Sequence, residues 1–196
     1  MSKEKSGQTS DADLVWKIGN KEKILETPVF TVNKSVNTAP DGRSGAYITI
    51  DAPDWAAVIP EVDGCFLMVK QWRHGSQSLS LEFPGGVVDP GESPQAGAAR
   101  ELLEETGCRA QSLVHLGSVS PNPALFTNRF HVFLARGLEA AGAQKLDDDE
   151  FLNCVRVPKE EVFAKMGGSE CPHALMVAAL ELYRERMSSF ANSEKV

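Results

Sequence analysis

The segment that most constrains the fold covers residues 85–107, GGVVDPGESPQAGAARELLEETG, where a glycine-rich turn leads into a run of strong helix formers. Ser93 is a good N-cap residue, and Pro94 suits the first helical position because its missing N–H would have had no partner there. Gly107 is the expected stop, since glycine readily adopts the left-handed conformation that ends many helices. The segment therefore predicts a loop followed by a helix of about three turns.

This predicted helix carries Glu101, Glu104 and Glu105, three like charges in one short segment. At about 100° per residue they fall within an arc of about 100° and face one way. Glutamates four positions apart destabilise a helix by roughly 0.2–0.5 kcal/mol per pair, so the cluster is unfavourable unless a cation neutralises it. One interpretation is a solvated acidic face. The other is a site for a hard divalent cation such as Mg²⁺, with Arg100 as a tether; the glycine-rich turn favours it, because such a turn suits close backbone approach.

Length, charge and cysteine usage limit the alternatives. With 196 residues, 42% of them hydrophobic, the chain predicts one domain with modest extensions. Its net charge of −7 argues against a nucleic-acid partner. The four cysteines are scattered without CxxC spacing, and the sequence shows neither a signal peptide nor an apolar run of membrane-spanning length. We expect a cytoplasmic protein with reduced thiols and no membrane partner.

Patterns along the chain predict a layered α/β fold. ILETPVFTVNKSV and SGAYITI, joined by the turn-rich NTAPDGRSG, predict an antiparallel N-terminal β extension over residues 13–52. WAAVIP and CFLMVK flank EVDG and predict a second hairpin, while RFHVFLA and FLNCVRV predict further strands. PKEEVFAKM and HALMVAALELYRERM predict helices. The main domain is expected over residues 53–189, with flexible tails at residues 1–12 and 190–196.

The segment 85–107 resembles the motif of the Nudix hydrolases: Gly, five residues, Glu, seven residues, Arg-Glu, an apolar residue, any residue, Glu-Glu, any residue, Gly and a bulky apolar residue. The matching positions are Gly86, Glu92, Arg100, Glu101, Leu102, Glu104, Glu105, Gly107 and Cys108. Only Cys108 departs, because it is small where a larger aliphatic residue is usual, and this concerns packing rather than chemistry. A match with this many fixed gaps is far more specific than a lone glycine triplet.

The resemblance covers roughly residues 15–187 and favours one branch of the family. KQWRHGSQSLSLEFPGG is similar to the strand and loop that precede the motif in ADP-ribose pyrophosphatases and related ADP-sugar hydrolases. SPNPALFTNRFHVFLA resembles their downstream proline-containing loop and strand. This implies a Nudix α/β/α sandwich with a mixed sheet, and an N-terminal β extension that in this branch helps to form a homodimer. The implied reaction is the attack of water on a diphosphate phosphorus, with Mg²⁺ or Mn²⁺ as cofactor.

ADP-ribose, cleaved to AMP and ribose 5-phosphate, is the substrate that the resemblance favours. Ala124 stands where ADP-ribose hydrolases often have glycine, and Asn128 stands near their acidic residue. An NDP-sugar such as ADP-glucose or GDP-mannose is therefore the alternative. A non-catalytic nucleotide sensor is a third interpretation, but such regulators often have a degenerate motif, whereas the acidic residues here are intact.

By position in the motif, the resemblance assigns roles to the charged residues of the helix. Glu101 and Glu105 should bind metal together with the Gly85 carbonyl. Glu104 should bind metal or position its water. Arg100 should orient the glutamates through charge-assisted hydrogen bonds.

Residues outside the helix complete the implied site. Glu92 should support the site indirectly, and Glu82 should be an additional metal or substrate contact. In this branch the catalytic base, or a further metal ligand, comes from a glutamate on the loop before the last strand. That position corresponds best to Glu150, and the neighbouring alternatives are Asp147, Asp148 and Asp149.

Substrate anions need positive charge in this acidic protein. Arg73 matches a phosphate-binding arginine of the branch, and its guanidinium fork suits phosphate oxygens; a salt bridge at the end of a strand is the alternative interpretation. Further candidates for contact with the substrate are Arg43, Arg129 and the Pro123 loop, and an aromatic wall for adenine could come from Trp16, Phe30 or Trp55.

Overall fold

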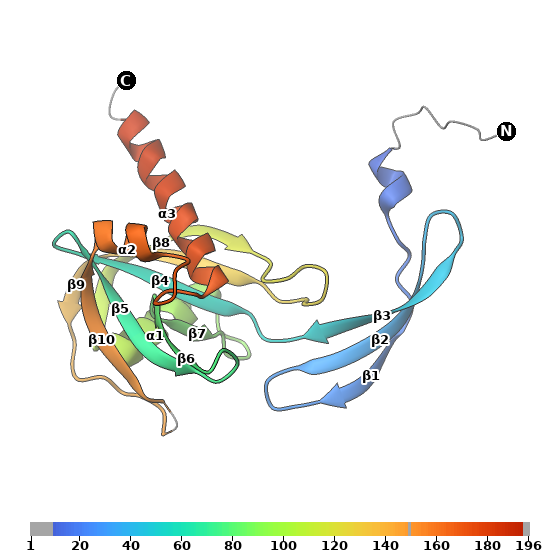
Figure 1. The fold of residues 1–196 in the computed structure, drawn as a ribbon, viewed down its shortest axis with the longest axis horizontal. Coiled ribbons are helices and arrows are strands. Elements are labelled where there is room, and N and C mark those ends of the chain that lie inside the picture. Colours follow the sequence, from blue (N-terminus) through green and yellow to red (C-terminus); the bar gives the residue numbers. More distant parts are fainter. Residues whose placement is uncertain (1–9, 149, 194–196) are drawn as a thin grey trace. The chain divides into compact units, whose positions relative to one another are not determined.

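The computed structural model describes residues 10–148 and 150–193, with backbone alone at residues 191–193. Within it, a smaller unit comprises the chain up to residue 52 together with residues 122–127 (Figure 1). A larger unit comprises residues 53–121 together with the chain from residue 128 onwards.

The smaller unit is built on an antiparallel sheet in the order β1-β2-β3. Its strands are β1 (Lys21–Glu26), β2 (Thr31–Thr38) and β3 (Ser44–Asp51). The predicted β extension is present, but ILETPVFTVNKSV forms a hairpin rather than one strand. The Thr27 hydroxyl donates to the Phe30 carbonyl at 2.8 Å, and Pro28 has no N–H to offer a neighbouring strand, so the chain turns there.

The segment predicted as an N-terminal tail, residues 1–12, overlaps a short 3₁₀ helix, η1 (Asp11–Leu14). The Ser10 hydroxyl accepts from the Ala12 N–H at 3.3 Å and caps this helix. Residues 1–9 lie outside the described part of the chain.

The larger unit contains a mixed sheet in which the path β10-β5-β4-β9-β8 carries β6 paired to β5 and β7 paired to β4. The strands are β4 (Trp55–Val62), β5 (Cys65–Arg73), β6 (Ser78–Glu82), β7 (Gly85–Val87), β8 (Cys108–Val119), β9 (Phe130–Ala140) and β10 (Leu152–Pro158). β4 and β9 are parallel, and the other pairs are antiparallel. This confirms the predicted mixed sheet.

Helices cover both faces of this sheet, and successive side chains of β4 point alternately to the two faces. Ala57 and Ile59 pack in a cluster with side chains of α3 (Ala174–Ser193) and with Val162 of α2 (Lys159–Lys165). Ala56 and Val58 face the other way and pack with α1 (Pro94–Thr106) (Figure 1). The α/β/α sandwich expected from the sequence is confirmed.

Several boundaries differ from the predictions. The hairpin around EVDG is present, with positive φ at Asp63 and Gly64. β6 is the strand before the motif that the family resemblance implied, whereas β7 and β8 were not predicted, because β7 is short and β8 is rich in polar residues. α3 continues through Phe190 to Ser193, into the segment predicted as a C-terminal tail. Among the described residues, no helix combines the length and apolarity needed to cross a membrane.

Candidate active site

The loop and helix of residues 85–107 form as the sequence predicts. The Ser93 hydroxyl accepts from the Ala96 N–H at 3.2 Å, and α1 begins at Pro94. Gly107 adopts φ 68° and donates its N–H to the Leu103 carbonyl at 2.8 Å, which ends the helix.

The glycine pair before the helix is explained by close approach. A Cβ at position 85 would lie 2.2 Å from the Ala56 carbonyl oxygen, so only glycine lets β7 pack against β4 there. A Cβ at position 86 would lie 2.4 Å from Oε1 of Glu101. The turn therefore brings bare backbone against the carboxylate that α1 presents.

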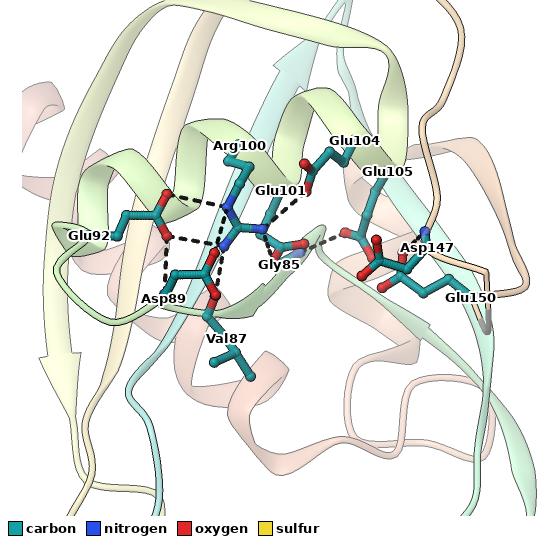
Figure 2. Close-up of polar contacts among 10 residues, drawn as sticks. All are labelled: Gly85, Val87, Asp89, Glu92, Arg100, Glu101, Glu104, Glu105, Asp147 and Glu150. Carbon is teal, nitrogen blue, oxygen red and sulfur yellow. Dashed lines mark hydrogen bonds and ion pairs between the residues drawn. The ribbon is translucent and has the colours of Figure 1, made fainter. Parts of the chain in front are cut away.

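Arg100 ties the acidic residues of this region together (Figure 2). Its Nη1 donates to Glu101 at 2.8 Å and to Glu104 at 3.0 Å. Nε and Nη2 donate to the two oxygens of Glu92, and Nη2 also reaches the Val87 carbonyl at 2.8 Å. A guanidinium has five N–H groups, so within the described chain each of them has an acceptor. Arg100 therefore makes the contacts expected of the tether that the sequence predicted for these glutamates.

Glu101 and Glu105 are buried carboxylates, and the described chain does not provide each of them with a cation of its own. Glu105 is 2% exposed and accepts from the Gly85 N–H at 2.8 Å. Burial raises its pKa to about 8, with the charges of Glu101 and Glu150 adding to the effect. Burial also raises the pKa of Glu101 to about 7, although Arg100 opposes the shift. This pair therefore favours a proton or a cation nearby.

These side chains line a cavity of about 420 Å³. Glu150, from the loop before β10, lies near Glu105, and its carboxylate accepts from the Asp147 N–H at 3.1 Å (Figure 2). The lining comprises Trp55, Gln71, Arg73, Gly85, Gly86, Val87, Asp89, Arg100, Glu101, Glu104, Glu105, Asp147 and Glu150. The cavity thus brings together carboxylates from α1 and from the loop before β10.

The family model of the NUDIX domain matches residues 52–176, which contain the cavity-lining residues. The chain belongs to the Nudix family.

Similar proteins cover most of this Nudix chain. The ADP-ribose pyrophosphatase of Bacillus subtilis (strain 168) is 30% identical over 163 residues, which are 82% of this chain and 88% of the relative. The ADP compounds hydrolase NudE of Escherichia coli (strain K12) is 30% identical over 168 residues, 85% and 90% of the two chains. A solved structure described as an ADP compounds hydrolase superposes with a TM-score of 0.79 at 28% identity, covering 89% of this chain and 95% of the other.

The acidic residues suit a hard divalent cation by chemistry. Carboxylate oxygens are the ligands that Mg²⁺ prefers, and within the described chain one oxygen each of Glu101, Glu104, Glu105 and Glu150 accepts no hydrogen bond. Among residues 10–148 and 150–193, no three His, Cys, Asp or Glu side chains are already grouped around a point that could hold an ion. These oxygen ligands therefore fit Mg²⁺ by their chemistry, but the described side chains do not already form a complete coordination shell around one point.

Gly85 and two of the acidic residues before β10 line the cavity. Gly85 donates its N–H to Glu105, and metal binding by its carbonyl stays a prediction. Asp147 and Glu150 both line the cavity, Asp148 is not among its lining residues, and Asp149 lies outside the described residues.

Arg73 and Glu82 were predicted as separate contacts, and the structure pairs them. Arg73 lines the cavity, while Glu82 is 1% exposed and is not among the lining residues. Arg73 Nε and Nη2 donate to the two oxygens of Glu82 at 2.9 and 2.5 Å. Sequence reasoning missed Gln71 as a lining residue, although the period of two along β5 places it on the face of Arg73.

Of the remaining predicted contacts, Trp55 lines the cavity, whereas Arg129, also in the larger unit, is not among the lining residues and donates from Nη2 to the Ser118 carbonyl at 2.7 Å. The others, Trp16, Phe30, Arg43 and Pro123, lie in the smaller unit, and their role in substrate binding stays a prediction. Trp16 and Arg43 line a hollow within that unit, and Arg43 pairs with Asp41 at 2.7 Å. Pro123 is exposed in the segment 122–127.

Proposed function

We propose that this chain hydrolyses ADP-ribose to AMP and ribose 5-phosphate with the help of Mg²⁺, or of Mn²⁺ in its place. The observation that carries the proposal is the meeting of Glu101, Glu104, Glu105 and Glu150 with Arg73 in one cavity of a Nudix domain. Relatives named ADP-ribose pyrophosphatase and ADP compounds hydrolase, at 30% identity over most of the chain, support the choice of substrate.

In this proposal the carboxylates of α1 would hold the divalent cation, which would neutralise diphosphate charge and lower the pKa of the attacking water, while Glu150 would serve as the base. Arg100 keeps Glu101 and Glu104 in place, since its N–H groups are fully used on them and on their neighbours. Arg73 binds a phosphate group of the substrate.

The bond changes follow from this arrangement. The Glu150 carboxylate accepts the proton of the attacking water, whose oxygen bonds to phosphorus while the anhydride P–O bond breaks. The Asp147 N–H holds one oxygen of Glu150 and leaves the other for this task.

An ADP-sugar is the second candidate substrate. The ADP-sugar pyrophosphatase of Mus musculus is 28% identical to this chain over 179 residues, which include 83% of this chain. The cavity acts on the diphosphate, which ADP-ribose and ADP-sugars share, so its acids alone do not choose between them. An NDP-sugar with another base, such as GDP-mannose, belongs in the same test.

We also propose that the chain forms a homodimer through its N-terminal β extension. The smaller unit exposes many large apolar side chains, which a partner copy would cover: Leu14, Val15, Ile18, Ile24, Leu25 and Val29. Light scattering on the purified protein tests this proposal, and a monomer at micromolar concentration would contradict it.

The cytoplasmic location stays a prediction from the scattered cysteines, which are free thiols in the structure.

The function is tested by incubating the protein with Mg²⁺ and a panel of ADP-ribose, ADP-glucose, GDP-mannose, diadenosine polyphosphates and NTPs. Chromatography then identifies the nucleotide released. We expect AMP from ADP-ribose with the highest kcat/KM. A higher kcat/KM for an NDP-sugar would move the assignment to that substrate, and no NMP from any compound would end the enzyme proposal.

A further inference from the structure

The cavity contains two guanidinium groups, and they differ in how many N–H groups they have left. Every N–H of Arg100 already has an acceptor among the described residues. Arg73 uses two of its N–H groups on Glu82, and within the described chain the other three, including both on Nη1, have no partner. Of the two guanidinium groups in the cavity, Arg73 is therefore the one with an N–H edge that is free for a bound anion.

Glu82 holds this arginine from below the cavity surface. Both carboxylate oxygens accept from the guanidinium in a bidentate pair, which fixes the plane of the group as well as its position. Burial alone would raise the pKa of Glu82, but its hydrogen bonds with Arg73 lower the pKa below the ordinary value, so the carboxylate is ionised.

Trp55 restrains the same guanidinium from another side. The Arg73 Cζ lies 5.8 Å from the centre of the Trp55 ring, within the range of a cation–π contact. The Trp55 ring also lies 6.3 Å from the ring of His173, and Trp55 itself begins β4. The arginine side chain is thus held by strand residues rather than by a loop.

We propose that Glu82 is a positioning residue that aims the free edge of Arg73 at the diphosphate of the substrate. The proposal rests on the proposed function and replaces the expectation that Glu82 contacts metal or substrate itself. A buried carboxylate with both oxygens on Arg73, and with no place in the cavity lining, acts on the substrate through the arginine.

A double-mutant cycle separates this role from a direct one. Glu82→Gln offers one carbonyl oxygen and one NH₂ group to two N–H donors, so the guanidinium must turn out of its present plane. We expect kcat/KM to fall roughly ten- to hundredfold, through a higher KM more than a lower kcat, because a phosphate contact of the bound substrate is lost. In the Arg73→Met background, Glu82→Gln should change kcat/KM less than about twofold, since the group through which it acts is gone.

The Mg²⁺ dependence distinguishes positioning from metal binding. The Mg²⁺ concentration for half-maximal rate should be the same in Glu82→Gln and in the unchanged protein. Additive losses in the cycle, a shifted Mg²⁺ dependence, or unchanged kinetics in Glu82→Gln would each overturn the proposal.

Two further measurements keep folding and the identity of the reaction separate from positioning. Glu61→Gln is the matched control, because Glu61 is a half-buried carboxylate that binds Lys159 and Tyr183 and does not line the cavity. It should lower the melting temperature without raising KM. If the protein releases no nucleotide from any substrate, the same double-mutant cycle is measured with the affinity for ADP, by calorimetry. A non-additive loss of affinity would then support positioning by Glu82 although the proposed function fails. No ADP binding to the unchanged protein would overturn both the positioning proposal and the proposed function.

Discussion

The Gly85 N–H donates to Oε2 of Glu105 at 2.8 Å, which ties the turn before α1 to the most deeply buried carboxylate of the helix. The bond orients Glu105 and leaves its other oxygen without a hydrogen bond in the described chain. The glycine is required because any Cβ there would collide with the Ala56 carbonyl. The turn thus packs against β4 and at the same time orients the Glu105 carboxylate.

Glu105→Gln tests what this carboxylate does. Glutamine keeps an oxygen for the Gly85 N–H and nearly the same volume, so the fold should survive, while the negative charge that we propose binds metal is lost. We expect kcat to fall by about two orders of magnitude or more, with the melting temperature equal to or above that of the unchanged protein. Near-normal turnover in Mg²⁺ would refute its role as a metal ligand.

Stability should depend on pH through Glu101 and Glu105. Their pKa values in the folded chain are about 7 and about 8, against an ordinary value of 4.5. Because the folded state holds these protons more tightly, the stability they contribute is fully present below pH 4.5 and is lost as the pH rises to about 8. The effect is on the order of a few kcal/mol, since each pKa unit corresponds to about 1.4 kcal/mol.

Mg²⁺ should reverse this loss if it binds the ionised carboxylates of Glu101 and Glu105, as we propose. Melting curves with Mg²⁺ and with EDTA should therefore differ more at pH 8 than at pH 5.5. In Glu101→Gln/Glu105→Gln both the pH slope and the Mg²⁺ effect should shrink. An equal Mg²⁺ effect at both pH values would contradict the assignment of these two residues.

Arg100→Lys tests the tether. A lysine ammonium has three N–H groups on one atom and cannot reach Glu92, Glu101, Glu104 and the Val87 carbonyl together. We expect a loss of about 1–3 kcal/mol in the free energy of unfolding and a roughly ten- to hundredfold loss in kcat/KM. The control is Arg109→Lys, an exposed residue of β8, which should leave both unchanged. Activity close to normal in Arg100→Lys would mean that the glutamates do not need this arginine.

Glu150→Gln addresses the catalytic base. If Glu150 accepts the proton of the attacking water, kcat should fall by about 10²–10⁴ and the acidic limb of the pH–rate profile should change. Asp147→Asn is the matched comparison, because Asp147 lines the same cavity and meets Glu150 through its backbone N–H. A large loss in Asp147→Asn with a small one in Glu150→Gln would move the role to the aspartate.

The parts of the fold that the sequence predicts are those with local signals. Ser93, Pro94 and Gly107 fix the ends of α1 by hydrogen bonds within a few residues, and the structure keeps those ends. The turn at Thr27 and Pro28 also has a local signal, but strand-like neighbours on both sides concealed it.

The parts of the site that the sequence could not predict depend on pairing across the sheet. Arg73 and Glu82 are nine residues apart, and the register of β5 with β6 places Arg73 opposite Ser78 and Glu82 opposite Val69. Both side chains lie on one face of the sheet, and the long arginine side chain reaches Glu82 along that face. The motif indicates acidic chemistry at Glu105, but the Gly85 N–H that orients this residue is fixed by the packing of β7 on β4. A sequence pattern identifies such residues, but it does not show which carboxylates lie close enough to interact or which of them bind the same arginine.

The central claim, metal-dependent cleavage of ADP-ribose, is tested most directly by incubating the full chain with ADP-ribose in Mg²⁺ and, in parallel, in EDTA. Chromatography of the products should show AMP and ribose 5-phosphate in equal amounts with Mg²⁺ and intact ADP-ribose with EDTA. Intact ADP-ribose in both samples, or equal cleavage in both, would contradict the account.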